Sequence, residues 1–202
     1  MSELDNTEVG DYRARGAETQ RRNSRNKIIG AAALHFFQDG YTSTSMGDIV
    51  VPSVSRATIY NRFASKDQIG TAVLESTFSS TIEAADADPG TRPTDVLAVS
   101  RLLQDVLSYY DGIGSALAGE RARTGLPNTD LIPDIYARFQ AVLTEGQANG
   151  DIRTDISADL MSDLYIDTIV TDSLSPSADP EQSMMRLTVL ADGMRAGVSG
   201  GE

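Results

Sequence analysis

Apolar side chains recur at helical spacing through most of this sequence, and no stretch of six or more residues alternates as a β-strand does. The clearest stripe contains Ile28, Ala32 and Phe36. Gly40 follows it and suits the left-handed residue that often ends a helix. Further helical patterns cover residues 65–82, 96–110, 113–123, 132–149, 156–174 and 180–196. The sequence therefore predicts an all-α fold.

Serine residues mark three predicted helix starts in the first third of the chain. The run from Ser45 to Asp48 fits a capping box, and Pro52 limits how far the helix after it can extend. Ser55 caps residues 56–63, and the run from Ser65 to Gln68 opens a longer helix. Together with the stripe before Gly40, these helices have the plan of a three-helix helix-turn-helix domain.

Charge is distributed unevenly along the chain, whose net charge is -12. Residues 12–66 hold nine basic and three acidic residues, whereas residues 67–202 hold eight basic and 22 acidic residues. A basic segment on an acidic body is expected of a DNA-binding region joined to a part that does not bind DNA. Chance clustering in a disordered tail explains Arg13 to Arg25 equally well, but it does not explain Arg56, Arg62 and Lys66.

Several function classes are excluded by what the sequence lacks. It has no cysteine and one histidine, His35, so disulfides, thiolate metal sites and a catalytic cysteine are impossible. It has no other nucleophile motif and no phosphate-cradling glycine loop. We therefore predict no enzyme activity, no cofactor and no metal, and a core role for His35. No run approaches the ~18 apolar residues that span a bilayer, so we expect a cytoplasmic protein without a membrane partner.

Three runs, residues 28–41, 44–49 and 54–67, resemble in their order the DNA-binding region of the TetR family. The resemblance implies a homodimer of about nine helices, in which each subunit gives two helices to a four-helix interface and the C-terminal domain binds a small molecule. This chain has one residue fewer than the family between Ile49 and Val54, and it lacks the glycine of that turn. We therefore expect the second helix to end early and its angle to the third to change.

The third helix is predicted to enter the major groove of a palindromic operator, with Val54, Ile59 and Phe63 facing inward. Arginine can bond to guanine and asparagine to adenine, while Tyr60 and Lys66 suit phosphates. The predicted DNA-binding set includes the cap residues, and the resemblance adds Thr44. The set is Thr44, Ser45, Ser55, Arg56, Ala57, Thr58, Tyr60, Asn61, Arg62 and Lys66.

Two sets of residues in the C-terminal half have competing interpretations. Aromatic and apolar side chains there could line an effector cavity or could be simple core; they are Tyr109, Tyr110, Tyr136, Phe139, Met161 and Tyr165. Four carboxylates recur every four residues and could hold a divalent cation or form a solvated face; they are Asp155, Asp159, Asp163 and Asp167. A straight helical row spreads its ligands over about 18 Å, so we favour the solvated face.

Residues 156–169 are apolar on two sides, which indicates contact with both the body and a second subunit. The sequence predicts a flexible arm at 1–22, a DNA-binding domain at 23–68, an effector and dimerisation domain at 69–197 and a flexible tail at 198–202. The predicted function is a repressor released from DNA when a small, largely apolar ligand binds. The alternative is a helix-turn-helix regulator that has no small effector and is controlled by a protein partner.

Overall fold

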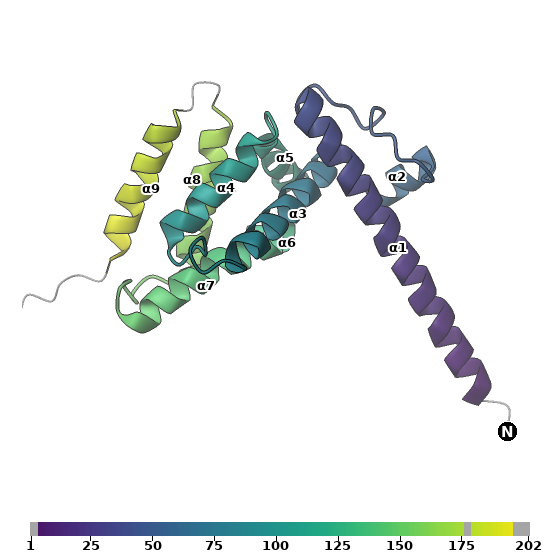
Figure 1. The fold of residues 1–202 in the computed structure, drawn as a ribbon, viewed down its shortest axis with the longest axis horizontal. Helices are drawn as coiled ribbons and strands as arrows, with labels where there is room; N and C mark the ends of the chain where they lie inside the picture. Colours follow the sequence, from purple (N-terminus) through teal and green to yellow (C-terminus); the bar gives the residue numbers. More distant parts are fainter. Residues whose placement is uncertain (1–3, 176–178, 196–202) are drawn as a thin grey trace, which may run out of the picture.

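The computed structural model describes residues 4–175 and 179–195. These residues form helices joined by loops, and their only β-type pairing is an isolated bridge between Ile152 and Arg195. The helices, drawn in Figure 1, are α1 Leu4–Asp39, α2 Arg56–Arg62, α3 Lys66–Asp86, α4 Val96–Ser108, α5 Gly114–Thr124, α6 Asn128–Leu131, α7 Pro133–Asn149, α8 Ala158–Ser173 and α9 Pro180–Met194. The predicted all-α fold is confirmed.

The first helix is much longer than its apolar stripe predicts. It ends as expected, with Gly40 at a φ of 81° donating its N–H to Phe36 O at 3.1 Å. It begins at Leu4, however, so residues 4–22 of the predicted flexible arm are helical. Residues 15–23 have almost no apolar side chains, but three are arginines and one each is alanine, glutamate and glutamine, which favour helix. This part of α1 extends away from the body in Figure 1.

The second predicted helix is reduced to a single turn over residues 46–48. Half of the expected capping box is present, because Asp48 Oδ2 accepts from Ser45 N at 2.8 Å and from Ser45 Oγ at 2.6 Å. No helix follows, since the segment before Pro52 is too short to add further turns and proline cannot continue a helix. The helix-turn-helix of this chain therefore consists of α1, this turn and α2.

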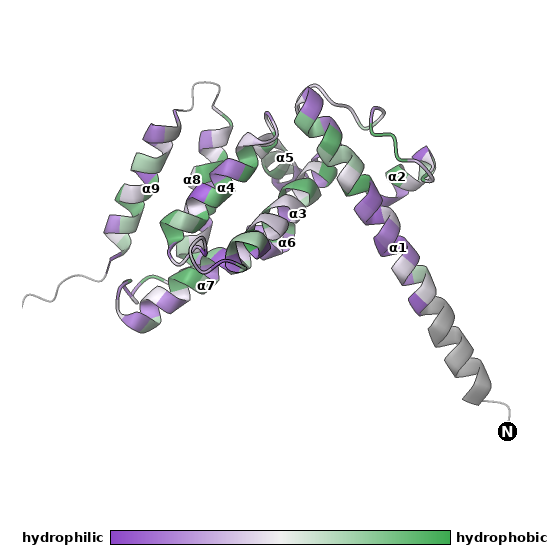
Figure 2. Ribbon diagram, viewed as in Figure 1, coloured by the Kyte–Doolittle hydropathy of each residue, from purple (hydrophilic) through white to green (hydrophobic). Residues whose placement is uncertain are grey.

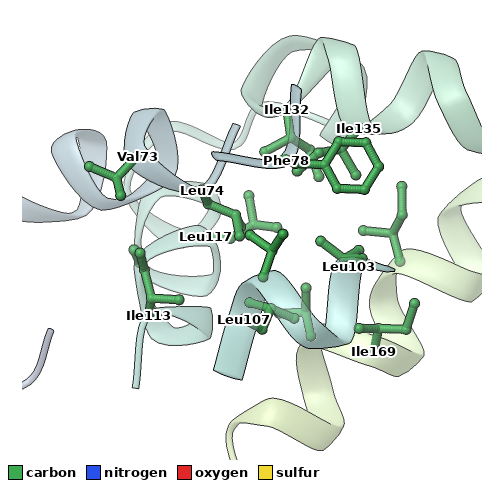
Figure 3. Packing of buried hydrophobic residues seen from close by; sticks show 14 of the residues in the cluster. Val73, Leu74, Phe78, Leu103, Leu107, Ile113, Leu117, Ile132, Ile135 and Ile169 are labelled. Atoms are coloured by element: carbon green, nitrogen blue, oxygen red, sulfur yellow. The ribbon is translucent and has the colours of Figure 1, made fainter. Parts of the chain in front are cut away.

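The body is built around α3, which packs against α1, α4, α5 and α7. Its buried side chains Val73, Leu74 and Phe78 meet apolar residues from α4, α5, α7 and α8 in one continuous core (Figure 3). Close packing of α3 on α5 depends on Gly70, where a Cβ would lie 2.6 Å from Ala116 Cβ. Because α3 touches both α1 and the body, it connects the DNA-binding region to the rest of the chain.

The remaining helices follow the predicted patterns closely. Gly150, at a φ of 80°, closes α7 as expected, and the break at residues 88–93 lies in the loop between α3 and α4. The four-residue α6 was not predicted, because so short a helix has no periodicity to detect. The tail predicted at residues 198–202 lies outside the described residues. In the described part of the chain, no helix combines the length and the apolar character needed to cross a membrane.

Candidate functional site

Helix α2 presents a polar outer face because two large side chains hold its inner face. Ser55 caps it by accepting a hydrogen bond from Thr58 N at 3.1 Å. Ile59 and Phe63 are 1% and 0% exposed, so their predicted inward packing is confirmed, and Val54 is half-buried against the same core. The opposite face carries exposed polar side chains of the types that contact bases and phosphates in a groove. Its exposed members are Arg56, Ala57, Tyr60 and Asn61.

The turn that leads into α2 has a left-handed residue that is not glycine. Ser53 has a φ of 68°, and Val54 N donates to Val51 O at 3.1 Å. Proline followed by a residue of positive φ fits a type II turn, in which glycine is favoured at the third position. A serine there costs about 1–2 kcal/mol. The shortened turn that leads into α2 thus has a strained backbone at Ser53. Lys27 Nζ donates to Ser53 Oγ at 3.4 Å.

Two of the predicted DNA-contact residues make hydrogen bonds inside the chain. Thr44 is 4% exposed and its Oγ1 donates to Gly40 O at 2.8 Å. Lys66 Nζ donates to Tyr41 O and to Thr44 O, each at 3.0 Å, and lies 4.2 Å from the centre of the Tyr41 ring. The side chain of Thr44 is thus withdrawn from the surface, and Lys66 ties the first turn of α3 to the segment after α1. Sequence position alone could not reveal these partners.

The other predicted contact residues lie at the surface with local roles. The hydroxyls of Ser55 and Thr58 are 2.8 Å apart. The hydrogen bonds from Ser45 lower the pKa of Asp48, since they stabilise the carboxylate. Arg62 is half-buried at the end of α2, and its Nε makes no hydrogen bond within the described chain.

A polar joint, which the sequence did not indicate, connects α1, α3 and the loop between α4 and α5. Tyr41 N donates to Asp111 O at 2.9 Å, and the Tyr41 hydroxyl donates to Asp67 Oδ1. Burial, followed by the bond to Asp67, raises the pKa of Tyr41. Ser65, the N-cap of α3, donates to buried Glu120 at 3.1 Å. Tyr41, which follows α1, is therefore hydrogen-bonded both to that loop and to α3.

The six residues proposed for an effector cavity are mostly core. Phe139, Met161 and Tyr165 are each 0% exposed, and the rings of Phe139 and Tyr165 stack with centres 6.1 Å apart. The Tyr165 hydroxyl is buried without a hydrogen-bond partner in the described chain, and burial raises its pKa. Tyr110 and Tyr136 are buried, whereas Tyr109 is exposed. The simple-core alternative describes the packing of these side chains.

A cavity of about 590 Å³ lies elsewhere, between α4, α8, α9 and the loop after α4, and none of those six residues lines it. Its floor is apolar and includes Leu107, Ile169 and Met184. On its polar side, Gln104 Nε2 donates to Ser183 Oγ at 2.7 Å, which donates to Asp172 Oδ2 at 2.6 Å. Asp111 and Gly112 of the polar joint also line it.

The four regularly spaced aspartates are each engaged by other side chains. Arg153 bonds Asp155, Gln140 bonds Asp159, Asn128 bonds Asp163 and Arg121 bonds Asp167. They are therefore neither a converging ligand set nor a freely solvated face. In the described residues, no group of three or more histidine, cysteine or acidic side chains is placed to hold a metal ion.

Comparison with known proteins points to one family. The family model described as "Bacterial regulatory proteins, tetR family" matches residues 28–73. The HTH-type transcriptional repressor DhaR of Mycobacterium sp. strain GP1 is 28% identical over 145 residues, which are 64% of this chain and 70% of DhaR. The family match spans the end of α1, the turn, α2 and the start of α3.

Solved structures resemble this chain over nearly its whole length. RolR in complex with resorcinol superposes with a TM-score of 0.64 at 17% identity, covering 90% of this chain and 91% of RolR. A TetR-family regulator from Pectobacterium atrosepticum has a TM-score of 0.58 at 18% identity, with coverages of 88% and 96%. FadR of Bacillus subtilis, solved with stearoyl-CoA, has a TM-score of 0.53 at 19% identity, with coverages of 87% and 98%. At these identities the likeness concerns the fold.

Proposed function

This chain belongs to the TetR family of bacterial transcriptional regulators, and on that premise we propose that it is a repressor released from a palindromic operator by a small molecule. It is a DNA-binding regulator and not an enzyme. The observation that carries the proposal is the outer face of α2, where Arg56, Tyr60 and Asn61 are exposed while Ile59 and Phe63 are buried. That face offers guanine, phosphate and adenine contacts on one rigid element.

Selection of bound duplexes from a random library tests the DNA-binding step. Purified full-length protein should enrich a palindrome whose half-sites are about one helical turn, or a multiple of it, apart. Asn61→Ala should lose roughly 1–3 kcal/mol of discrimination at one base pair. Gln38→Ala, which removes an exposed amide from α1, is the matched control and should leave specificity unchanged. Failure to enrich any palindrome would contradict the proposal.

A homodimer is the form that would read such an operator, and the surfaces of α8 and α9 support it. Met161 and Tyr165 of α8 face the core, while Leu160 and Leu164 are 62% and 44% exposed. On α9, Met185 and Val189 are 68% and 66% exposed. Each pair is spaced four residues apart, so each helix has an uncovered apolar stripe. A second copy would cover both stripes in a four-helix interface.

Light scattering on the purified protein tests the dimer. Wild type should have twice the mass of one chain, and Val189→Arg should shift the population to monomer and weaken operator binding. Thr144→Arg, at an exposed position of α7, introduces the same charge outside this surface and should remain dimeric. A monomeric wild type at micromolar concentration would contradict the proposal.

The cavity beside α4, α8 and α9 is the proposed effector site. Its volume of about 590 Å³ lies in the ordinary range for small-molecule sites. Arg101 lines it and forms no ion pair within the described chain, so its guanidinium is available to a ligand. A small ligand with a largely apolar body and a hydroxyl or carboxylate group fits this combination of an apolar floor and a polar rim.

The same cavity offers a route to DNA release. Asp111 and Gly112 form part of its wall, and Asp111 O accepts from Tyr41 N at the end of α1. A Cβ on Gly112 would lie 2.4 Å from Thr42 Oγ1, so the loop and the end of α1 are in close contact. A ligand that displaces the loop shifts α1 and α2, and its affinity then opposes that of DNA.

Thermal unfolding with and without candidate ligands tests this step, and resorcinol is a first probe because RolR was solved with it. A ligand at 100 times its Kd raises stability by about 2.7 kcal/mol, and it should weaken operator binding reciprocally. Ser108→Trp, which fills the cavity, should abolish both effects. A ligand that stabilises this variant equally would place the site elsewhere. The second candidate, regulation by a protein partner, predicts that no small molecule changes operator affinity.

A further inference from the structure

The N-terminal half of α1 and the end of α2 form a cleft rich in arginine. The cleft has a volume of about 1070 Å³, and the charged residues that line it are Arg15, Glu18, Arg21, Arg22, Arg25 and Arg62. The lining thus contains five guanidinium groups and one carboxylate. Figure 2 shows the hydrophilic stretch of α1 beside α2.

Helical spacing gathers these side chains on one side of α1. Arg15, Glu18, Arg22 and Arg25 follow one another at intervals of three or four residues, which places them in one row. Arg25 fixes the direction of the row, because its guanidinium carbon lies 4.6 Å from the centre of the Phe63 ring. The row therefore faces α2 and continues at Arg62.

Three of the arginines that line the cleft have no carboxylate partner in the described part of the chain. The guanidinium groups of Arg21, Arg22 and Arg62 form no ion pair within the described residues, and burial lowers the pKa of Arg25. Like charges held this close raise the free energy of the folded chain unless an anion neutralises them. Phosphate oxygens suit guanidinium groups well, because the two can form paired hydrogen bonds.

We propose that this cleft binds the phosphodiester backbone of duplex DNA beside the half-site that α2 reads. Residues 15–25 extend along about 15 Å of helix axis, comparable with about four base pairs at 3.4 Å each. The contacts add affinity and fix register without selecting sequence. The inference rests on the proposed function, since it extends the DNA contact beyond the helix-turn-helix.

The test compares two doubly substituted full-length proteins of equal net charge on a duplex selected by wild type. In Arg21→Ala/Arg22→Ala the cleft loses two exposed cations, whereas Arg92→Ala/Arg195→Ala removes two exposed cations from the body. The cleft variant should lower the slope of log affinity against log salt by about four, because a dimer loses two cations from each of its two clefts. Between 50 and 200 mM salt, wild type should therefore lose about a hundredfold more affinity than the cleft variant. The body variant should match wild type.

Shortening the duplex on both sides of the half-sites sharpens the test. Wild type should lose affinity on the short duplex, while the cleft variant should lose little, because the two changes remove the same contacts. Equal losses for both proteins would overturn the proposal. So would an unchanged salt slope in the cleft variant, or salt-dependent self-association of wild type that this variant lacks. Absence of any selected duplex would instead reject the DNA-binding function itself.

Discussion

Arginine residues are used differently in the two halves of the molecule. After residue 66 there are eight arginines, and all except Arg101 form an ion pair with a carboxylate of the body. In α1 and α2, by contrast, Arg21, Arg22, Arg56 and Arg62 form none within the described residues. The body thus neutralises nearly all of its arginines internally, whereas these four arginines of α1 and α2 have no carboxylate partner in the described chain.

This difference explains how a strongly acidic chain can bind DNA. The paired arginines of the body contribute to its fold and leave an excess of carboxylates, which repel phosphate. The unpaired arginines gather on one small region, and the phosphates of DNA are the anions they would meet. The net charge of the chain therefore reflects its body, whereas the unpaired arginines indicate which region would contact DNA.

The largest expected effect concerns the small core that supports the unpaired cations. Phe63 is 0% exposed, and Arg25 lies on its ring. Phe63→Ala should lower the free energy of unfolding by about 3–5 kcal/mol, measured by chemical denaturation. Tyr60→Ala, on the exposed face of the same helix, should leave stability nearly unchanged while weakening DNA binding. Equal losses of stability in the two variants would contradict the assignment of Phe63 to the buried face of α2 and Tyr60 to its exposed face.

A second prediction tests the pairing contrast directly. Arg121 Nη2 donates to Asp167 Oδ1 at 2.7 Å and also bonds the side chain of buried Asn128. Arg121→Ala should therefore cost roughly 1–3 kcal/mol of stability, because charge-assisted hydrogen bonds are lost and a buried amide is left unsatisfied. Arg22→Ala should change stability little and weaken DNA binding. If both substitutions changed stability and DNA binding to the same extent, the proposed difference between paired and unpaired arginines would be contradicted.

Glu75 is a half-buried carboxylate of α3 that forms no ion pair in the described chain. Its carboxylate caps α7 by accepting from the N–H of Asp134 and of Ile135. Burial raises its pKa from 4.5 to about 7. The folded state therefore binds this proton more tightly than the unfolded state. The resulting stability is complete below about pH 4.5 and is lost as pH rises to about 7.

Denaturation between pH 5 and pH 8 measures this contribution. Glu75 keeps some contact with solvent, so we expect wild type to lose about 1–2 kcal/mol over this range through Glu75. Glu75→Gln keeps an acceptor for α7 and should remove that slope. Glu83→Gln, an exposed carboxylate on the same helix, is the control. A slope that persists in Glu75→Gln would assign the dependence to another group.

The smallest effect concerns the strained turn before α2. Ser53→Gly should stabilise the fold by up to about 1 kcal/mol, because glycine adopts a positive φ without strain but loses more entropy on folding. Ser53→Ala keeps the strain and removes the hydroxyl that Lys27 contacts, so it should not stabilise. Thermal unfolding distinguishes the two variants. Destabilisation by glycine would show that the contact with Lys27 outweighs the strain.

Local signals predicted the course of the chain well. Serine and glycine caps at Ser55, Ser65, Gly40 and Gly150 end or begin helices as expected, because a cap depends only on residues within one turn. The four-residue spacing of Ile59 and Phe63 correctly predicted which side of α2 is buried. The absence of a glycine in the turn before α2 predicted an altered turn geometry, and Ser53 there has a positive φ.

Partners distant in the sequence were beyond such signals. Lys66, which the sequence suggested as a phosphate contact, bonds the carbonyls of Tyr41 and Thr44, residues more than twenty positions earlier. Phe139 and Tyr165 have the composition of a ligand site, yet α7 and α8 press them together as core. Composition describes what a side chain can do, and its neighbours decide which of those possibilities it uses.

The sequence by itself thus determined the all-helical fold, the helix-turn-helix and the basic segment, since periodicity, capping and charge are written in neighbouring residues. Tertiary structure alone decided which cations remain unpaired, where the cavity beside α4 lies, and that the arginines of α1 face α2. Each of these depends on long-range packing, which sets the distance between groups that the sequence separates by tens of residues.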